Sequence, residues 1–511
     1  MTKNLAKVFS AELEGIDARL VEVEVDLNVG LHAFNIVGLA DKALNEAKER
    51  VNSALKNSGT KPPNRENRKI TVNLAPADMK KTGSQYDLAI AIGYLLATKQ
   101  IGEFETADKI FVGELALDGH LRPVSGALNT AELAARRGFK KIFLPKENSG
   151  EATVIMGIET IPIESLAEAI EVLEGKREVS AARSSNFEAR ERSTTDFSEI
   201  KGQENAKRAL TIAVAGGHNL LMIGPPGVGK SLLAQAMLGI MPDLEPGEAI
   251  EVTKIWSAAG LSTGKLIVSR PFRSPHQTAS VVSIIGGGTD PRPGEISLAH
   301  RGVLFLDELP EFQKNVLESL RGPLESGRVH VARAKKTLVF PSKFTLVAAM
   351  NPCPCGYFGD PEKECRCRPY DVLRYQKKIS GPLMDRIDLQ IKVPRVALIS
   401  LREKNSTGQE SPQFRKKIEA ARKIQERRLR KGGSQGARLN AEMTSKQTDE
   451  LVSLETEAES FLNTLENAKL SPRGYYRLLK TARTIADLEE SEKISANHLA
   501  EAFSYRLKEE I

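Results

Sequence analysis

The segment 224–231 reads Gly-Pro-Pro-Gly-Val-Gly-Lys-Ser and constrains the fold of this chain more than any other stretch. It fits the pattern G-x-x-x-x-G-K-[ST], in which a glycine-rich loop between a strand and a helix wraps the phosphates of a nucleotide. The apolar run 218–223 before the loop is typical of a buried strand, and residues 232–238 after it are typical of a helix. The pattern therefore predicts an α/β core that binds a nucleotide.

Each part of the loop has an expected role. Glycines at 224, 227 and 229 let backbone N–H groups approach the phosphates, and the N-terminus of the following helix adds positive potential. Lys230 is expected to reach the β- and γ-phosphates, and the Ser231 hydroxyl is expected to bind Mg²⁺. The expected nucleotide-binding residues are Gly224, Pro225, Pro226, Gly227, Val228, Gly229, Lys230 and Ser231.

A second motif lies about eighty residues downstream. The apolar run 303–306 predicts a strand, and it ends in two carboxylates, Asp307 and Glu308. Asp307 is expected to hold the Mg²⁺ through water, and Glu308 is expected to polarise the attacking water. Together with the phosphate loop, this pair predicts hydrolysis of ATP rather than nucleotide binding alone.

The composition fits a folded protein of several domains. The chain has 511 residues, of which 41% are apolar. It has no apolar run of about eighteen residues and no leader-like start, so we expect a cytoplasmic protein that does not contact the membrane. The net charge of +7 permits a nucleic-acid partner, but a solvated basic surface explains it equally well. Aromatic residues make up only 5%, which argues against base stacking as the main mode of DNA contact.

The order of the segments predicts the domain organisation. Residues 1–175 alternate strand-like and helical stretches, which predicts a compact α/β domain. Residues 176–195 are polar and are expected to form a linker. The ATPase core is expected over 196–401 and a helical lid over 402–511. A P-loop α/β core followed by a helical lid is the AAA+ arrangement, in which subunits form rings.

Further residues fit the AAA+ pattern. Asn351 follows the apolar run 347–350 and resembles sensor 1, which positions the attacking water. Arg386 resembles the arginine finger that acts on the nucleotide of a neighbouring subunit. The alternative for Arg386 is a local ion pair with Asp385 or Asp388.

A helix that opens at 471–474 supplies the last expected catalytic residue. Arg473 resembles sensor 2, which touches the γ-phosphate and couples hydrolysis to movement of the lid. Arg477 lies one helical turn further on and is the alternative for this role.

Three runs carry a closer resemblance, at 294–308, 351–356 and 482–488. With them the chain resembles the ComM/YifB family of magnesium-chelatase-like AAA+ ATPases over nearly its whole length. The resemblance implies a homo-hexameric branch-migration helicase that uses ATP and Mg²⁺ and takes part in DNA uptake and recombination. Its implied partner is single-stranded or branched DNA. The alternative is a chelatase-like or chaperone-like ATPase that remodels a protein partner.

The run 111–124 resembles the catalytic domain of Lon protease and its relative in RadA. Lon uses a Ser–Lys dyad, but here Gln85 or Tyr86 occupies the serine position, with Ser84 adjacent. The segment 126–132, which should supply the lysine, has none, and a serine without its base is not activated. We therefore expect a non-proteolytic domain that forms the ring or contacts DNA, and a Lon-like protease is the least favoured alternative.

All the cysteines fall within an insertion at 353–367, as Cys353, Cys355, Cys365 and Cys367. Four thiolates can close a tetrahedral Zn²⁺ site, and disulfides are disfavoured in the cytoplasm. We therefore expect structural zinc. The C-x-C spacing is tighter than the usual C-x₂-C, so reduced thiols and redox disulfides stay open as alternatives.

Two segments are candidates for DNA contact. The run 327–340 predicts a β-hairpin whose tip carries Arg333, Lys335 and Lys336. In the related MCM helicases a hairpin at this place projects into the ring channel, and cations there suit contact with phosphates. The alternative is an exposed basic turn. The Gly- and Pro-rich run 284–294 is expected to form a second pore loop.

Overall fold

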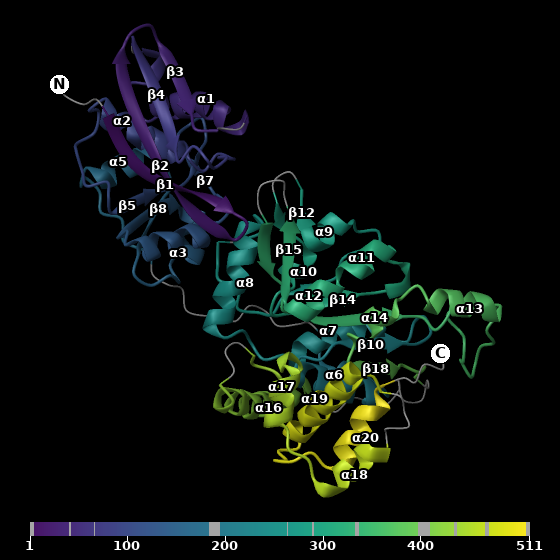
Figure 1. The fold of residues 1–511 in the computed structure, drawn as a ribbon. Coiled ribbons are helices and arrows are strands. Elements are labelled where there is room, and N and C mark those ends of the chain that lie inside the picture. The colour runs from purple at the N-terminus through teal and green to yellow at the C-terminus, as the bar shows by residue number, and fades with distance from the viewer. Residues whose placement is uncertain are drawn as a thin grey trace.

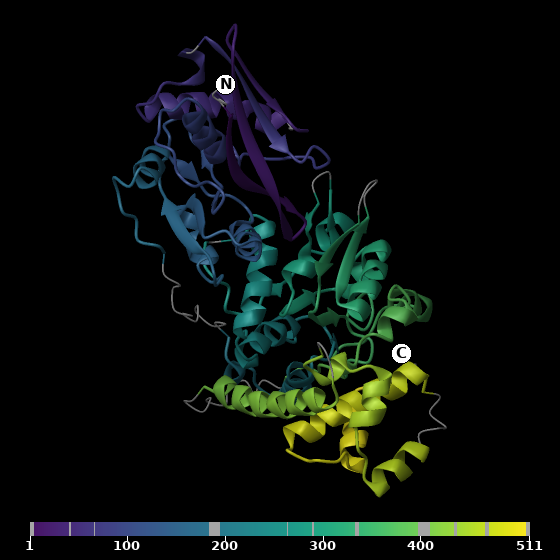
Figure 2. The same cartoon turned by 60° about the vertical axis from the view of Figure 1, so that its left-hand side comes forward.

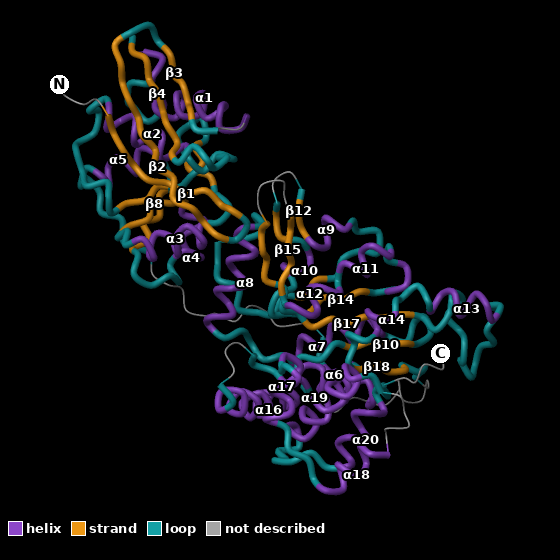
Figure 3. Tube along the Cα trace, in the orientation of Figure 1, coloured by secondary structure: helices purple, strands orange, loops and turns teal. Residues whose placement is uncertain are grey.

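The computed structural model describes residues 5–39, 42–65, 67–182, 195–262, 264–288, 291–332, 337–396, 409–433, 437–464 and 470–506. An N-terminal domain, a central domain and a C-terminal helical region follow one another along the chain (Figure 1). Strands occupy the first two, while the described C-terminal residues form helices (Figure 3). Among the helices of these ranges, none combines the length and apolar character needed to cross a membrane.

The N-terminal domain is built on a mixed sheet of seven strands. In spatial order these are β3 (Ala33–Val37), β4 (Arg68–Ala75), β2 (Asp17–Val29), β1 (Leu5–Glu14), β5 (Lys109–Phe111), β8 (Lys141–Pro145) and β9 (Glu159–Ile163). Every second residue of β2 is buried from Val21 to Leu27, as expected when one face of a strand covers a core. Helix α2 (Asp87–Ala97) lies inside this core, where only Leu96 is not fully buried.

The N-terminal domain docks directly on the central domain. Helix α3 (Ala127–Arg137) packs on α8 (Pro246–Ala258) of the central domain. The Asn129 side-chain amide donates to the backbone carbonyl of Ile16 at 2.6 Å and to that of Lys254 at 3.3 Å. Glu132 pairs with the Lys254 ammonium at 2.5 Å. Figures 1 and 2 both show the turn of the β1–β2 hairpin reaching the central domain, where Ile16 packs against its core.

The central domain holds a sheet of five parallel strands. In spatial order these are β11 (Phe272–Arg273), β14 (Val303–Leu306), β17 (Thr345–Met350), β10 (Leu220–Ile223) and β18 (Leu389–Lys392). Every residue of β10, β14 and β17 is buried, which is typical of a parallel sheet covered by helices on both faces. Helices α6 (Glu204–Gly216) and α7 (Lys230–Ile240) pack against one another beside it.

The C-terminal region packs as a helical lid against the central domain. Its helices are α16 (Ser411–Lys431), α17 (Ser445–Leu451), α18 (Thr456–Thr464), α19 (Pro472–Leu488) and α20 (Ala496–Ser504). Helix α16 contacts α6 and α7, and α19 contacts α6. The Ser471 hydroxyl caps α19 by accepting a hydrogen bond from the Gly474 amide at 3.1 Å. The predicted fold class, a P-loop α/β core with a helical lid behind a separate α/β domain, is confirmed.

The contact between the domains gives the first testable prediction. Asn129 is buried, so Asn129→Ala leaves the Ile16 and Lys254 carbonyls without this donor, at a cost of roughly 1–3 kcal/mol. Trp256 is the single tryptophan of the chain and lies on α8, so its fluorescence reports on this contact. We expect a lower thermal midpoint of the Trp256 signal in Asn129→Ala.

Asn57→Ala is the matched control, because Asn57 makes an exposed hydrogen bond to the Leu117 carbonyl within the N-terminal domain. It should leave the Trp256 midpoint unchanged. Equal midpoints for Asn129→Ala and the wild type would contradict the role of Asn129 in docking.

Candidate active site

Three neighbouring parallel strands bring the predicted ATPase residues to one edge of the central sheet. β10 ends at Ile223, directly before the phosphate loop. β14 ends at Leu306, before Asp307 and Glu308, and β17 ends at Met350, before Asn351. β17 lies between the other two strands, so all these residues meet at the carboxyl edge of the sheet.

The phosphate loop has the backbone that its glycines permit. Gly227 and Gly229 adopt φ values of 80° and 88°, in the left-handed region that favours glycine. A Cβ on Gly224 would lie 2.3 Å from the Val393 carbonyl oxygen, so any larger residue there would clash. Lys230 is the first residue of α7, and the loop therefore leads directly into a helix N-terminus.

The Lys230 ammonium is held inside this loop. It donates to the carbonyls of Gly224 at 2.6 Å and Pro225 at 2.8 Å, and to Asn351 Oδ1 at 3.1 Å. Burial lowers the pKa of Lys230, while Asp307 and Glu308 act in the opposite direction. A nucleotide phosphate can replace these neutral acceptors with charged oxygens, which form stronger hydrogen bonds with an ammonium group.

Ser231 and Asp307, the residues predicted to hold Mg²⁺, are already in contact. The Ser231 hydroxyl donates to Asp307 Oδ2 at 2.8 Å. A hydroxyl beside a carboxylate is an oxygen donor set that suits Mg²⁺, which takes few protein ligands together with phosphate oxygens and water. The residues present therefore fit this ion.

Glu308 has an unusual backbone. Its φ of 52° lies in the left-handed region, which is uncommon for a residue other than glycine, and its amide donates to Asp307 Oδ1 at 2.9 Å. Such conformations cluster at functional sites, where the surrounding structure holds them. The turn leaves the Glu308 side chain exposed beside the phosphate loop rather than packed in the core.

Arg386 and Arg473 lie at the opposite edge of the sheet. They line a cavity of about 1260 Å³ together with Asn219, Thr345 and Asp388, which lie at or before the first residues of β10, β17 and β18. Within the described chain, no residue of the phosphate loop lines this cavity. The structure therefore separates both arginines from the ATPase residues of the same chain.

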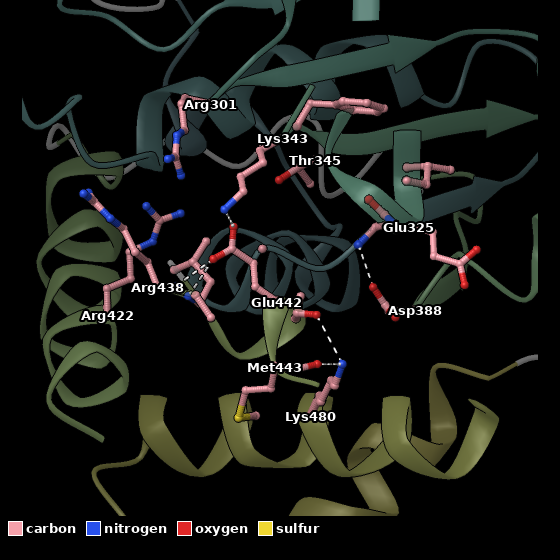
Figure 4. A pocket seen from close by; sticks show the side chains of 18 of the residues that line it. Arg301, Glu325, Lys343, Thr345, Asp388, Arg422, Arg438, Glu442, Met443 and Lys480 are labelled. Carbon is pink, nitrogen blue, oxygen red and sulfur yellow. Dashed lines mark hydrogen bonds and ion pairs between the residues drawn. The ribbon is translucent and has the colours of Figure 1, made fainter. Parts of the chain in front are cut away.

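The cavity between core and lid is rich in charge. Arg301 from the core and Arg422 and Arg438 from the lid point into it, and Lys343 pairs with Glu442 across it at 3.7 Å (Figure 4). Motif spacing gave no sign of this convergence, because its members come from segments far apart in the chain.

Arg386 does not have the partner that its neighbours in the sequence suggested. Arg386 donates to Glu325 Oε2 at 2.5 Å, not to Asp385 or Asp388. Arg473 pairs with the same Glu325 through Oε1 at 2.9 Å. Glu325 was not among the predicted site residues.

Arg477, the alternative to Arg473, belongs to a buried ionic group. It lies 3.6 Å from Asp388, with His218 on the other side at 3.7 Å. Burial raises the pKa of Asp388, but Arg477 and His218 outweigh it and lower this pKa to about 2. Arg477 is therefore engaged in packing the lid on the core.

The four cysteines form a compact cluster. The Sγ of Cys353 lies 3.4 Å from that of Cys355 and 3.7 Å from that of Cys365, and all four ligand atoms lie within 4.8 Å of one another. Sulfurs at about 2.3 Å from a tetrahedral Zn²⁺ lie about 3.8 Å apart, so the cluster fits the ion. Slight burial raises the pKa of Cys355, but the amides of Tyr357 and Arg366 outweigh it and lower this pKa to about 6. For Cys365 and Cys367 a backbone amide lowers the pKa, but burial and the Cys353 and Cys355 thiols outweigh it and raise this pKa.

The cysteine cluster adjoins the phosphate loop. A Cβ on Gly356 would lie 2.6 Å from Pro226 Cδ, and the Gln376 amide donates to the Pro352 carbonyl at 3.1 Å. The segment that follows Asn351 therefore packs against the loop that would hold the nucleotide.

The candidate DNA segments lie side by side but are described only in part. β15 (Arg328–Ala332) and β16 (Thr337–Pro341) form the expected hairpin, and its tip residues Arg333, Lys335 and Lys336 lie outside the described residues. Within 284–294, α9 (Val281–Ile285) leads into a two-stranded ribbon of β12 (Gly286–Gly287) and β13 (Arg292–Pro293). A Cβ on Gly287 would touch Val331, so the ribbon and the hairpin are neighbours.

Among the described residues of the N-terminal domain, no lysine is hydrogen-bonded to Ser84. The Ser84 hydroxyl donates to a Glu114 carboxylate oxygen, and the Lys81 ammonium donates to the Pro76 carbonyl. Helix α3, which corresponds to the lysine-bearing segment of Lon, contains no lysine. A carboxylate partner is an acceptor and gives Ser84 no amine base of the Lon kind.

The cysteine cluster gives the second testable prediction. Purified protein should carry about one zinc per chain, because four thiolates complete a tetrahedral site. Cys365→Ser combined with Cys367→Ser should lose the metal and lower the thermal midpoint. Elemental analysis and thiol titration measure this directly, since the chain has only these four cysteines. Metal-free protein with four freely reacting thiols and unchanged stability would contradict zinc binding.

Comparisons with known proteins cover nearly the whole chain. The family profile described as magnesium chelatase, subunit ChlI, matches residues 196–401. Two related profiles, subunit ChlI of Mg-chelatase and the ChlI C-terminal region, match 23–148 and 408–506.

Individual relatives agree with the profiles. The competence protein ComM of Haemophilus influenzae is 42% identical over 512 residues, which covers 98% of this chain and 97% of that protein. YifB of Escherichia coli is 42% identical over 505 residues, with the same coverage. The magnesium-chelatase 38 kDa subunit of Rhodobacter capsulatus is 27% identical over 183 residues, 32% of this chain and 52% of that protein. With its P-loop core and helical lid, the chain belongs to the ComM/YifB family of magnesium-chelatase-like AAA+ ATPases.

Proposed function

We propose that this protein is an ATP-driven ring motor that acts on DNA, as a hexameric branch-migration helicase. The observation that best supports a ring is the separation of two groups of residues at opposite edges of one sheet. Lys230, Asp307 and Glu308 lie at the carboxyl edge, while Arg386 and Arg473 lie at the amino edge.

A ring of identical subunits brings the two edges together. If the carboxyl edge of one central sheet faces the amino edge of the next, the arginines of one subunit reach the nucleotide of its neighbour. Such a head-to-tail contact is heterologous and closes into a ring when the rotation allows it. Each ATP site is then completed by two chains.

The chemistry assigned to the site follows from its parts. Lys230 binds the β- and γ-phosphates, and Ser231 and Asp307 hold the Mg²⁺ that neutralises phosphate charge. Glu308 and Asn351 orient the attacking water. Arg386 and Arg473 of the neighbour stabilise the charge that develops on the transferred phosphoryl group.

The assignment to DNA is supported by three facts. The relative from Haemophilus influenzae is named a competence protein and aligns with 98% of this chain. The net charge is +7. The hairpin β15–β16 and the ribbon β12–β13 lie side by side, and the sequence at the hairpin tip carries Arg333, Lys335 and Lys336. Cations there suit the phosphate backbone of a strand in the channel.

A chelatase-like or chaperone-like ATPase that remodels a protein partner is the second candidate. The similarity of about a third of the chain to the magnesium-chelatase 38 kDa subunit favours it. The same ATP site would drive either machine. Stimulation of the ATPase by DNA separates the two.

The ATP site gives the third prediction. Glu308→Gln keeps the shape of the side chain but cannot polarise water as a carboxylate does, so ATP should bind while turnover is lost. Lys230→Ala removes the cation that faces the phosphates and should weaken ATP binding itself. Equilibrium binding of ATP and phosphate release measure the two effects separately. Wild-type turnover in Glu308→Gln would show that another group activates the water.

The proposed contact with DNA gives the fourth prediction. Lys335→Ala combined with Lys336→Ala should reduce DNA-stimulated ATPase and strand movement, while basal ATPase persists. Each lost phosphate contact should reduce the salt dependence of duplex binding by about 0.9 in log–log slope. Titration of labelled DNA at several salt concentrations measures this slope.

Lys416→Ala combined with Lys417→Ala is the matched control, because it removes two exposed lysines from the lid helix α16. It should leave DNA binding unchanged. If the wild type shows no DNA stimulation, the remodelling ATPase becomes the better assignment. If the hairpin variant alone behaves like the wild type, DNA is held elsewhere.

A further inference from the structure

One carboxylate joins the core and the lid at the amino edge of the central sheet. Glu325 lies in α12 (Arg321–Ser326), and its Oε2 accepts a hydrogen bond from Arg386 of the core at 2.5 Å. Its Oε1 accepts one from Arg473 of the lid helix α19 at 2.9 Å. Each oxygen of Glu325 therefore holds a different arginine.

The two arginines depend on Glu325 to different degrees. The Arg386 side chain is only 8% exposed and is also held by the Pro382 carbonyl at 2.6 Å. The Arg473 side chain is 58% exposed, and Glu325 is the single partner of its guanidinium in the described part of the chain. Without Glu325, Arg473 would be free to turn away from Arg386.

Charge explains why a carboxylate is needed at this place. Two guanidinium groups held close together repel one another, and an anion between them removes most of that cost. The pKa of Glu325 is lowered, mainly by its hydrogen bond from Arg386, so the carboxylate stays ionised at neutral pH.

The arrangement leaves donors available for a phosphate. A guanidinium has five N–H groups, and Glu325 takes only one from each arginine. The buried Nε of Arg386 has no hydrogen-bond partner among the described residues. Both arginines line the cavity, so the unused donors of the largely exposed Arg473 can meet an anion that enters it.

We propose that Glu325 is a positioning residue for ATP hydrolysis, which holds Arg386 and Arg473 together as one clamp for the nucleotide of the neighbouring subunit. The inference rests on the proposed ring, in which these arginines act across the subunit boundary. Because Glu325 ties a lid residue to a core residue, it also makes the clamp sensitive to the position of the lid.

The first test compares Glu325→Gln and Glu325→Asp with the wild type. Glu325→Gln keeps the size of the side chain but removes the charge, and a clamp displaced by about 1 Å should lower kcat roughly 10- to 100-fold. KM for ATP should change little, since Glu325 acts through the arginines and the phosphate loop that binds ATP stays intact. Glu325→Asp keeps the charge and should recover part of kcat.

Glu426→Gln is the matched control. Glu426 also lines this cavity and forms an ion pair with Arg430 at 2.6 Å, but it does not contact either clamp arginine. Its kcat should equal that of the wild type. Sedimentation shows whether each variant still forms the ring, so that loss of assembly is recognised.

The second test uses mixed rings. Glu325→Gln subunits have an intact phosphate loop, and Lys230→Ala subunits have an intact clamp, so an equimolar mixture should regain ATPase at the mixed interfaces. A mixture of Glu325→Gln with Arg386→Ala should regain none, because every clamp in it is damaged.

Either of two results would overturn the positioning role of Glu325, and a third would overturn the action of the arginines across the subunit boundary. One is a wild-type kcat in Glu325→Gln. The other is a difference between two mixtures with Lys230→Ala: Arg386→Ala regains ATPase activity, but Glu325→Gln does not. That result would indicate that Glu325 has only a structural role. If neither variant regains ATPase activity in rings shown to mix, the arginines do not act on the nucleotide of the neighbouring subunit. The proposed clamp is then wrong as well. If the protein does not act on DNA, DNA will not stimulate the ATPase, but the basal rates compared here are unaffected. The two proposals can therefore fail separately.

Discussion

The parallel pairing of β14, β17 and β10 is the constraint on which the rest of the structure depends. Ile223 pairs with Met350, and Leu306 pairs with Ala348, so the three strands end at one edge within a residue or two of one another. Because these strands run in the same direction, the residues that follow them must meet. The same direction sends the residues that precede them to the opposite edge, where the arginine cavity lies.

The carboxyl edge of the central sheet, where the ATPase residues lie, is stabilised by buried contacts rather than by exposed ones. The strands are apolar and fully buried, so a shift in register would expose core residues and is strongly disfavoured. On this support the chain maintains a buried lysine and a left-handed backbone at Glu308. The packing of Gly356 on Pro226 also places the cysteine cluster against the loop, so a metal there would stiffen one wall of the site.

Much of the fold and the carboxyl edge could be predicted from the sequence, because each motif directly follows its own strand. The helix start at Ser471 was predictable for a similar reason, since a cap acts on its own first turn. The run 110–115 is apolar enough to predict one continuous strand, and that prediction is wrong in its length. β5 ends at Phe111, and β6 (Glu114–Leu115) turns away to pair with β7 (Leu121–Arg122), because the Gly113 amide and carbonyl bond to Gln85 and Leu88 instead of continuing the sheet.

The arrangement of Arg386, Arg473 and Glu325 at the amino edge of the sheet could not be predicted in the same way. Arg386 and Glu325 are 61 residues apart, and Arg473 and Glu325 are 148 apart. Neither separation leaves a periodic signal, and the lid must dock before the contact between Arg473 and Glu325 exists. The tip of the basic hairpin lies outside the described residues, so Arg333, Lys335 and Lys336 stay predictions from the sequence.

The central claim is that one chain holds an incomplete ATP site. Specific ATPase activity measured against protein concentration, with the fraction of assembled rings followed by sedimentation in the same buffer, tests it most directly. The account predicts that activity per chain follows the fraction of rings and falls nearly to zero as they dissociate, although ATP still binds at Lys230. Full activity per chain in a preparation that sediments as a monomer would contradict it.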